Sequence, residues 1–208
     1  MSGDSVRVAQ PLFPVDGQGS IPMSPLQFEI VQINASLAMN LNKLWHSRLP
    51  FIPKISISMN KNKICFGAVY KNIYYASAIW TDPITRAFNG KNYLELRRMA
   101  ISEDSPKNTA SRIICIMAKE IKNQFPKIWK LISYQDTEVH SGTIYKASNW
   151  VSANIFSKSN WLVGRKDGIH RNNYQASGPK IRWEKQIRPE PETIIKPPKK
   201  PPQKGLFF

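Results

Sequence analysis

Hydrophobic and polar residues follow two periods along the chain, one typical of strands and one typical of helices. Alternation or short apolar runs predict strands at 26–33, 54–60, 63–70, 73–80, 93–101, 127–134, 151–156 and 160–164. Apolar residues at helical spacing predict helices at 34–50 and 110–125, each ended by a proline. A shorter helix is expected within 140–150. This order of elements predicts a mixed α/β sheet with helices on its faces.

The predicted elements define one domain with an extension at each end. Residues 1–24 are rich in Gly, Pro and Ser, which predicts a flexible arm. Residues 25–165 hold all the predicted strands and helices and form the domain. Beyond that point the pattern fades, so 166–208 is interpreted as a basic extension with a Pro- and Lys-rich tail from 188 onward.

The net charge of the chain indicates which classes of partner it can bind. It carries 30 Lys and Arg against 14 Asp and Glu, a formal net charge of +16, and the excess is not confined to the tail. Such a field attracts polyanions, of which nucleic acid is the commonest, although an anionic membrane surface or a ribosome would also satisfy it. No apolar run reaches the roughly 18 residues that a membrane span requires. The first residues lack a secretory signal pattern, which indicates a cytoplasmic protein.

Two cysteines and three histidines limit the metal and disulfide chemistry. Cys65 and Cys115 lie in apolar segments, which predicts buried free thiols in a reducing cytosol. No spacing among the cysteines and histidines is typical of zinc, so no metal site is assigned.

The segment 93–112 combines a strand, a polar loop and the start of a helix. The free N–H groups and the dipole at a helix start favour anions, so this segment is a candidate cradle for a diphosphate. Asn108 or Thr109 is expected to cap the helix. The alternative is an ordinary capped helix with solvated charges. The candidate binding residues are Arg97, Arg98, Lys107, Asn108, Thr109, Ser111 and Arg112; the two adjacent arginines are expected to face opposite sides of the sheet.

Three further residues are candidates for chemistry. Asp136 ends a predicted strand, where polar groups often line a ligand crevice, although aspartate also favours turns. His46 lies on an amphipathic helix, where histidine is more often structural than catalytic. Tyr145 lies in the short helix, which Gly142 and Asn149 would start and stop, and it is either a packing tyrosine or a proton donor.

The order of these blocks resembles the GNAT acyltransferase superfamily. The blocks WHSRLP, LELRRMAI, PKNTASR and ISYQDTEVHSGTIYKASNW more specifically resemble the phage Mom family, over about residues 45–165. The resemblance implies a GNAT-like mixed, mostly antiparallel sheet flanked by helices, with an acyl-CoA pyrophosphate on the helix after the fourth strand. PKNTASR departs from the GNAT phosphate motif because it lacks the Gly-x-Gly/Ala.

The resemblance also implies an activity. Mom proteins convert adenine in DNA to N6-carbamoylmethyladenine, which blocks restriction enzymes. Tyr145, Asp136 and His46 would then be catalytic, the donor would be acetyl-CoA or a related acyl group, and the partner would be double-stranded phage DNA in the host cytoplasm, with no membrane involved. The metal requirement and the oligomeric state stay open, and a dimer is compatible with the sequence. The alternatives are an N-acetyltransferase for a small amine or a protein, and a basic nucleic-acid-binding protein without enzymatic activity.

Overall fold

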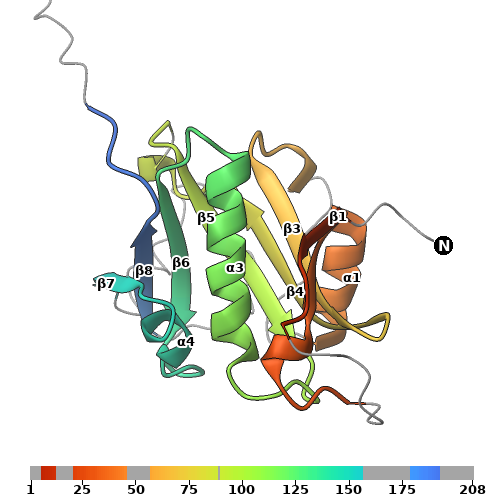
Figure 1. Ribbon diagram of the computed structural model, residues 1–208. Helices are drawn as coiled ribbons and strands as arrows, with labels where there is room; N and C mark the ends of the chain where they lie inside the picture. Colours follow the sequence, from red (N-terminus) through yellow and green to blue (C-terminus); the bar gives the residue numbers. More distant parts are fainter. Residues whose placement is uncertain (1–5, 13–20, 46–56, 89, 157–178, 193–208) are drawn as a thin grey trace, which may run out of the picture.

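The computed structural model describes residues 6–12, 21–45, 57–88, 90–156 and 179–192 (Figure 1). An eight-stranded sheet forms the centre, in the order β1-β2-β3-β4-β5-β6-β8-β7. The strands are β1 (Val6–Ala9), β2 (Glu29–Ile33), β3 (Lys63–Tyr70), β4 (Ile73–Thr81), β5 (Tyr93–Ile101), β6 (Lys130–Asp136), β7 (Val151–Phe156) and β8 (Lys180–Gln186). The helices are α1 (Ala35–Trp45), α3 (Thr109–Gln124) and α4 (Thr143–Lys146), with 3-10 turns η1 (Pro25–Gln27) and η2 (Arg86–Phe88).

One strand pair differs from all the others in the sheet. Neighbouring strands are antiparallel except β5 and β6, which run parallel. Parallel neighbours require a crossover, and α3 supplies it. The two strands pair from Tyr93 beside Lys130 to Leu96 beside Ser133, and among the described residues the ladder ends there. The remaining halves of β5 and β6 therefore share no backbone hydrogen bonds.

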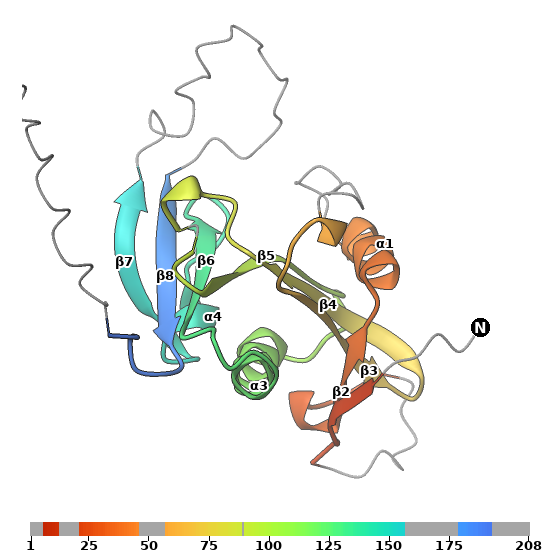
Figure 2. The ribbon, with the colours of Figure 1, turned by 90° about the horizontal axis from the view of Figure 1, so that it is seen from above.

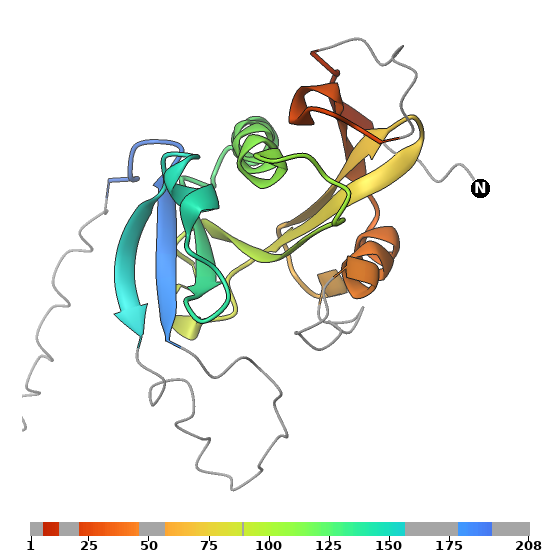
Figure 3. The same ribbon diagram turned by 90° about the horizontal axis from the view of Figure 1, so that it is seen from below.

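The helices cover the two faces of the sheet in an unequal way. α3 and α4 lie on one face, and α1 lies on the other (Figures 2 and 3). α3 buries one stripe at helical spacing, formed by Ile113, Ile114, Met117 and Ile121, against the central strands. α1 buries Ala38 and Met39 in a second, smaller cluster. The sheet bends around α3, so the half containing β6, β8 and β7 stands at an angle to the rest (Figure 2).

Several predicted elements are confirmed. β3 and β5 occupy the predicted residues, and β4, α1 and α3 agree within the described residues to a few positions at their ends. The predicted mixed, mostly antiparallel α/β sheet is also confirmed. No helix in the described part of the chain is long and apolar enough to span a membrane.

Other predictions are corrected. The strand predicted at 54–60 is wrong where it is described, because Ile57 and Ser58 are helical and Asn60 N donates to the Ile57 carbonyl in a turn. Ile57 is fully buried, so tertiary packing outweighs the alternating pattern. Residues 54–56 and the strand predicted at 160–164 lie outside the described residues.

Both extensions contribute a strand to the sheet. β1 lies in the segment predicted as a flexible arm and pairs with β2, and Arg7 forms an ion pair with Glu29. β8 lies in the segment predicted as a basic extension, and it fills the place between β6 and β7. The two cysteines are free thiols, as predicted, but Cys115 is exposed on α3. Only Cys65 is buried, and this burial raises the pKa of its thiol to about 12.

Candidate active site

Tyr145 is at the centre of a buried group of aromatic residues on the face that carries α4. Its ring stacks on Trp183 of β8, with ring centroids 5.3 Å apart and planes 14° from parallel. Trp150 meets the same ring edge-on, with centroids 5.6 Å apart. Only 7% of Tyr145 is exposed. The two tryptophans therefore fix the ring, and the position of its hydroxyl follows from them.

The Tyr145 hydroxyl pairs with Ser133, at the point where the β5–β6 ladder ends. The two hydroxyl oxygens are 2.8 Å apart. Ser133 Oγ also lies 3.4 Å from the Leu96 carbonyl oxygen, to which it can only donate. A serine has one hydroxyl hydrogen, so Tyr145 is then the donor in the pair. Burial raises the pKa of Tyr145, and the Ser133 hydrogen bond opposes this effect.

Gly142 allows α4 to begin close to β6 and β8. Its φ is +74°, in the left-handed region that glycine adopts without strain. A Cβ atom here would lie 2.5 Å from Gln135 Oε1 and 2.8 Å from a ring carbon of Trp183. Asn149, with φ of +57°, ends the same segment as expected.

We expect Gly142→Ala to destabilise the fold by about 2–4 kcal/mol, because it combines backbone strain of about 1 kcal/mol with a steric clash in the core. Chemical denaturation would measure the loss. Gly90→Ala is the matched control, since Gly90 has the same φ of +74° but nothing within 4 Å of an added Cβ. Equal losses in the two variants would show that close packing at Gly142 contributes nothing.

The N-terminus of α3 lies beyond the last residue of β5 and lacks a side-chain cap. Asn108 occupies the cap position with φ of +67°, and its side chain makes no capping hydrogen bond. The expected cap by Asn108 or Thr109 is therefore wrong, because Thr109 Oγ1 donates to the Pro106 carbonyl instead, at 2.6 Å. Asparagine tolerates the left-handed region, so Asn108 provides a backbone turn that glycine would otherwise supply.

The other polar residues of the predicted cradle differ in their surroundings. Ser111 Oγ donates to the Asn108 carbonyl at 3.0 Å, and Lys107 is exposed. Arg112 Nε is buried and has no hydrogen-bond partner among the described residues. Desolvation lowers the pKa of Arg112. An uncapped helix start beside a buried donor provides the charge and the N–H groups that an anion requires.

Arg97 and Arg98 lie at a bulge in β5. The pairing of β4 passes from Ile79 beside Arg98 to Trp80 beside Leu96, so Arg97 has no counterpart in β4. A bulge breaks the strict alternation of side chains, and the expectation that the two arginines face opposite sides therefore loses its basis. Both act electrostatically on Glu95, whose pKa is raised by burial, while a backbone hydrogen bond from Ile84 and the two arginines oppose the rise.

Glu95 is a candidate that the sequence pattern did not reveal. Only 5% of it is exposed, and its Oε2 accepts a hydrogen bond from Ile84 N at 3.0 Å. A buried carboxyl group with a raised pKa is a frequent feature of active sites. The available signal was a single acidic residue within the apolar start of a strand.

Of the three predicted catalytic residues, the structure describes Asp136 and Tyr145, and it does not bring these two together. Asp136 forms an ion pair with Lys180 at 3.0 Å and accepts Glu138 N in a turn, as the alternative reading of this aspartate required. It alternates with Gln135 along β6 and so faces away from the Tyr145 side of the sheet. His46 lies outside the described residues. Among the described residues, no three His, Cys, Asp or Glu side chains gather in a metal-binding group.

The model of the Mom protein family matches residues 27–195. The chain belongs to the Mom protein family. The match confirms the resemblance and covers β2 to β8, including every described residue of this site. A relative of this Mom-family chain, the methylcarbamoylase mom of Escherichia phage Mu, is 33% identical over 63 residues. Those residues are 30% of this chain and 26% of the relative, so the alignment spans well under half of either protein.

Solved structures show the same fold at low sequence identity. The ribosomal-protein-S18-alanine N-acetyltransferase of Escherichia coli matches with a TM-score of 0.55 and 14% identity, over 79% of this chain and 97% of that one. A GNAT family acetyltransferase of Elizabethkingia anophelis, with acetyl-CoA bound, matches with a TM-score of 0.53 and 14% identity, over 77% and 99%. The Mom-family chain therefore has the fold of GNAT acetyltransferases.

Proposed function

We propose that this chain is a transferase that adds a carbamoylmethyl-type group to the N6 amine of adenine in phage DNA, which protects the DNA from restriction in the host cytoplasm. The observation that carries the proposal is the Ser133–Tyr145 hydroxyl pair, held at the end of the β5–β6 ladder in a member of the Mom family. It places an ionisable hydroxyl at the interruption of the sheet, where groups on the two faces can meet.

The start of α3 fits an acyl-CoA donor. Its first turn has no side-chain cap, and the buried Arg112 Nε beside it has no partner among the described residues. Lys107, Asn108, Ser111 and Arg112 would hold the phosphates, while Thr109 maintains the turn through Pro106. An acyl-CoA supplies an activated thioester, and attack of an amine on its carbonyl carbon forms an N-acyl product and releases CoA as the thiol. A carbamoylmethyl group would additionally require a bond from N6 to a methylene carbon and a source of the amide nitrogen, neither of which this step provides. The related acetyltransferase from Elizabethkingia anophelis contains acetyl-CoA, which supports a donor of this class.

Two side chains of the protein would move protons. In the acyl-transfer step, Tyr145 Oη would donate a proton to the leaving CoA thiolate after its hydroxyl rotates away from Ser133. Glu95 would accept the proton that the exocyclic amine loses, since a carboxylate with a raised pKa is a stronger base than an ordinary one. The two residues belong to opposite faces of the sheet, so donor and acceptor would approach from opposite sides.

DNA would have to present its adenine outside the helix stack. The N6 amine is paired within a duplex, so the base must be flipped or met single-stranded. The net charge of +16 provides affinity for the phosphate backbone that does not depend on sequence.

Mass analysis of nucleosides would test this function in cells that express the chain. A deoxyadenosine with increased mass is the expected result. Unmodified DNA together with turnover of acetyl-CoA on a small amine or a protein would instead identify an N-acetyltransferase. Unmodified DNA without any turnover of acetyl-CoA would indicate a nucleic-acid-binding protein without enzymatic activity.

We expect Ser111→Glu to weaken the binding of acetyl-CoA by roughly tenfold or more, because a negative charge at the start of α3 repels phosphate. Isothermal titration calorimetry with acetyl-CoA would measure the change. Asn123→Glu adds the same charge to an exposed position in the last turn of the same helix and serves as the control. Unchanged affinity in a folded Ser111→Glu protein would place the phosphates elsewhere.

A further inference from the structure

The sheet face opposite α3 and α4 is basic over β6 and β8. Alternation along these strands places Lys130 and Tyr134 of β6, and Lys180 and Arg182 of β8, on this face. Phe156 of β7 and Lys91, which precedes β5, contribute to the same surface. α1 contacts β3, β4 and β5 and not the β6–β8 half. On that half the short turn η2 packs Phe88 against Arg182, and no described α-helix lies there on this side (Figure 2). These six residues are called the basic face below.

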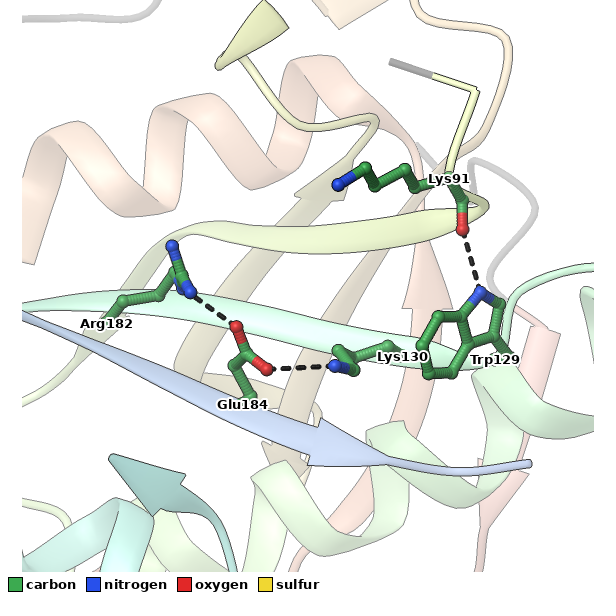
Figure 4. A network of polar contacts seen from close by, with 5 residues as sticks. All are labelled: Lys91, Trp129, Lys130, Arg182 and Glu184. Carbon is green, nitrogen blue, oxygen red and sulfur yellow. Dashed lines mark hydrogen bonds and ion pairs between the residues drawn. The ribbon is translucent and has the colours of Figure 1, made fainter. Parts of the chain in front are cut away.

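Aromatic rings hold the cationic groups of the basic face. The Lys130 ammonium lies 4.7 Å from the ring centre of Trp129, and the Arg182 guanidinium lies 5.0 Å from that of Phe88 and 5.9 Å from that of Phe156. Trp129 is itself fixed, since its Nε1 donates to the Lys91 carbonyl at 2.8 Å (Figure 4). Contacts of this kind stabilise cations by about 0.5–2 kcal/mol. The cations are therefore positioned before any ligand arrives.

A shared carboxylate links the two central cations. Glu184 accepts from Lys130 at 3.0 Å and from Arg182 at 2.8 Å, so both point to one place across neighbouring strands (Figure 4). The side chains of Lys130 and Arg182 are 20% and 15% exposed. With Lys91 and Lys180 the surface has four cationic groups, against the two carboxylates Glu184 and Asp136. A net positive surface of ordered cations complements a polyanion.

The basic face adjoins the proposed acceptor side of the active site. Arg182 and Thr85 hydrogen-bond the hydroxyl of Tyr134, which also lies within the electrostatic range of Glu95. Tyr134 follows directly after Ser133, where the β5–β6 ladder ends. A strand of nucleic acid bound along β6 and β8 would thus pass next to Glu95.

We infer that the basic face binds the phosphate backbone of the substrate DNA next to the target adenine. The inference rests on the proposed function, because it names the surface by which that substrate is held. Lys130 and Arg182 would contact phosphates, and Lys91 would add an exposed charge at the rim. A membrane with anionic lipids carries the same sign of charge as DNA. Binding to a membrane would not explain why the basic face adjoins the buried carboxyl group of Glu95, whereas binding of the substrate DNA does.

The test compares two charge-matched double variants of the full chain. Lys130→Gln with Arg182→Gln removes two cations from the basic face, and the amides still hydrogen-bond Glu184. Lys119→Gln with Lys122→Gln removes two exposed cations from α3, on the other side of the sheet. Fluorescence anisotropy with a short labelled duplex over a series of salt concentrations measures both. We expect the first pair to lose on the order of tenfold in affinity and about two units of salt slope, and the second pair much less.

A single variant, vesicle binding and nucleoside analysis provide further tests of the basic face. Lys91→Gln breaks no ion pair of the described structure and should reduce the salt slope by about one unit, which tests the face if the double variant fails to fold. Equal losses in the two double variants would overturn the inference. DNA affinity that persists while binding to phosphatidylserine vesicles falls would also overturn it, in favour of a membrane surface. Nucleoside analysis separates this inference from the proposed function. If the Lys130→Gln/Arg182→Gln variant binds DNA normally and still produces modified adenine, the inference about the basic face is refuted and the proposed function is not.

Discussion

Tyr145→Phe should reduce the yield of modified adenine by a factor on the order of 10²–10⁴, the usual cost of a lost general acid. The variant keeps the ring that stacks on Trp183 and Trp150, so no cavity forms. It loses the hydrogen bond to Ser133, which should cost about 1 kcal/mol of folding stability. Nucleoside mass analysis measures the product, and thermal unfolding measures the stability.

Ser133→Ala distinguishes a chemical role of the tyrosine from a structural one. This variant also breaks the Ser133–Tyr145 hydrogen bond, but it retains the tyrosine hydroxyl. If the hydroxyl donates a proton to the leaving group, Ser133→Ala should keep far more activity than Tyr145→Phe. Equal losses in the two variants would show that the hydrogen bond matters for structure, and the role of Tyr145 as an acid would be abandoned.

Glu95→Gln should remove most of the activity, by about 10²-fold or more, without destabilising the protein at neutral pH. Glutamine keeps the shape and an oxygen that can accept the hydrogen bond from Ile84 N. It cannot accept the proton of the amine. Glu120→Gln is the control, because Glu120 is a partly exposed acid on α3 whose hydrogen bond to Gln124 has no link to the site. Full activity of Glu95→Gln would exclude this carboxylate as the base.

Because the pKa of Glu95 is raised in the folded state, the difference in stability between Glu95→Gln and the natural chain should depend on pH. Burial raises the pKa of Glu95 above its ordinary value of 4.5, so the folded state binds the proton more tightly than the unfolded state. The resulting contribution to stability is fully present below pH 4.5 and is lost as the pH rises through the folded pKa. Glu95→Gln should therefore gain stability relative to the natural chain as the pH rises. Urea unfolding at several pH values would show this trend.

The sequence predicted those elements whose side chains follow a period. α3 was predictable because Ile113, Met117 and Ile121 recur at helical spacing, and β3 and β5 because apolar runs end in turn residues. β8 was missed, although Ile181 and Trp183 alternate with charged residues, because it lies in a segment where the positive charge dominates. Lys180 and Glu184 of β8 form ion pairs with Asp136 and Lys130 of the neighbouring strand β6. The local sequence pattern does not indicate these pairings.

The candidate site was predicted in part for a similar reason. Turn chemistry at Gly142 and Asn149 is local, and these two residues start and stop the short helix as expected, each with a positive φ. The partners of Tyr145 are not local, since Ser133 lies in another element and Trp183 lies beyond residue 165. The bulge at Arg97 depends on the register between β4 and β5, so the sequence alone could not indicate which face each arginine takes.

The position of β8 between β6 and β7 affects the order in which the chain can fold during synthesis. β7 leaves the ribosome before β8, yet its described pairing is with β8 and not with β6, which precedes it in the sequence. Until Trp183 emerges, Tyr145 lacks the ring on which it stacks, and Gln135 lacks the indole N–H that it accepts at 2.7 Å. Contacts between distant residues form slowly, since a long loop has to close first. A nascent chain that ends before Lys180 would therefore expose an incomplete aromatic core, and the proposed catalytic site would be completed only when β8, which is translated after β7, has emerged.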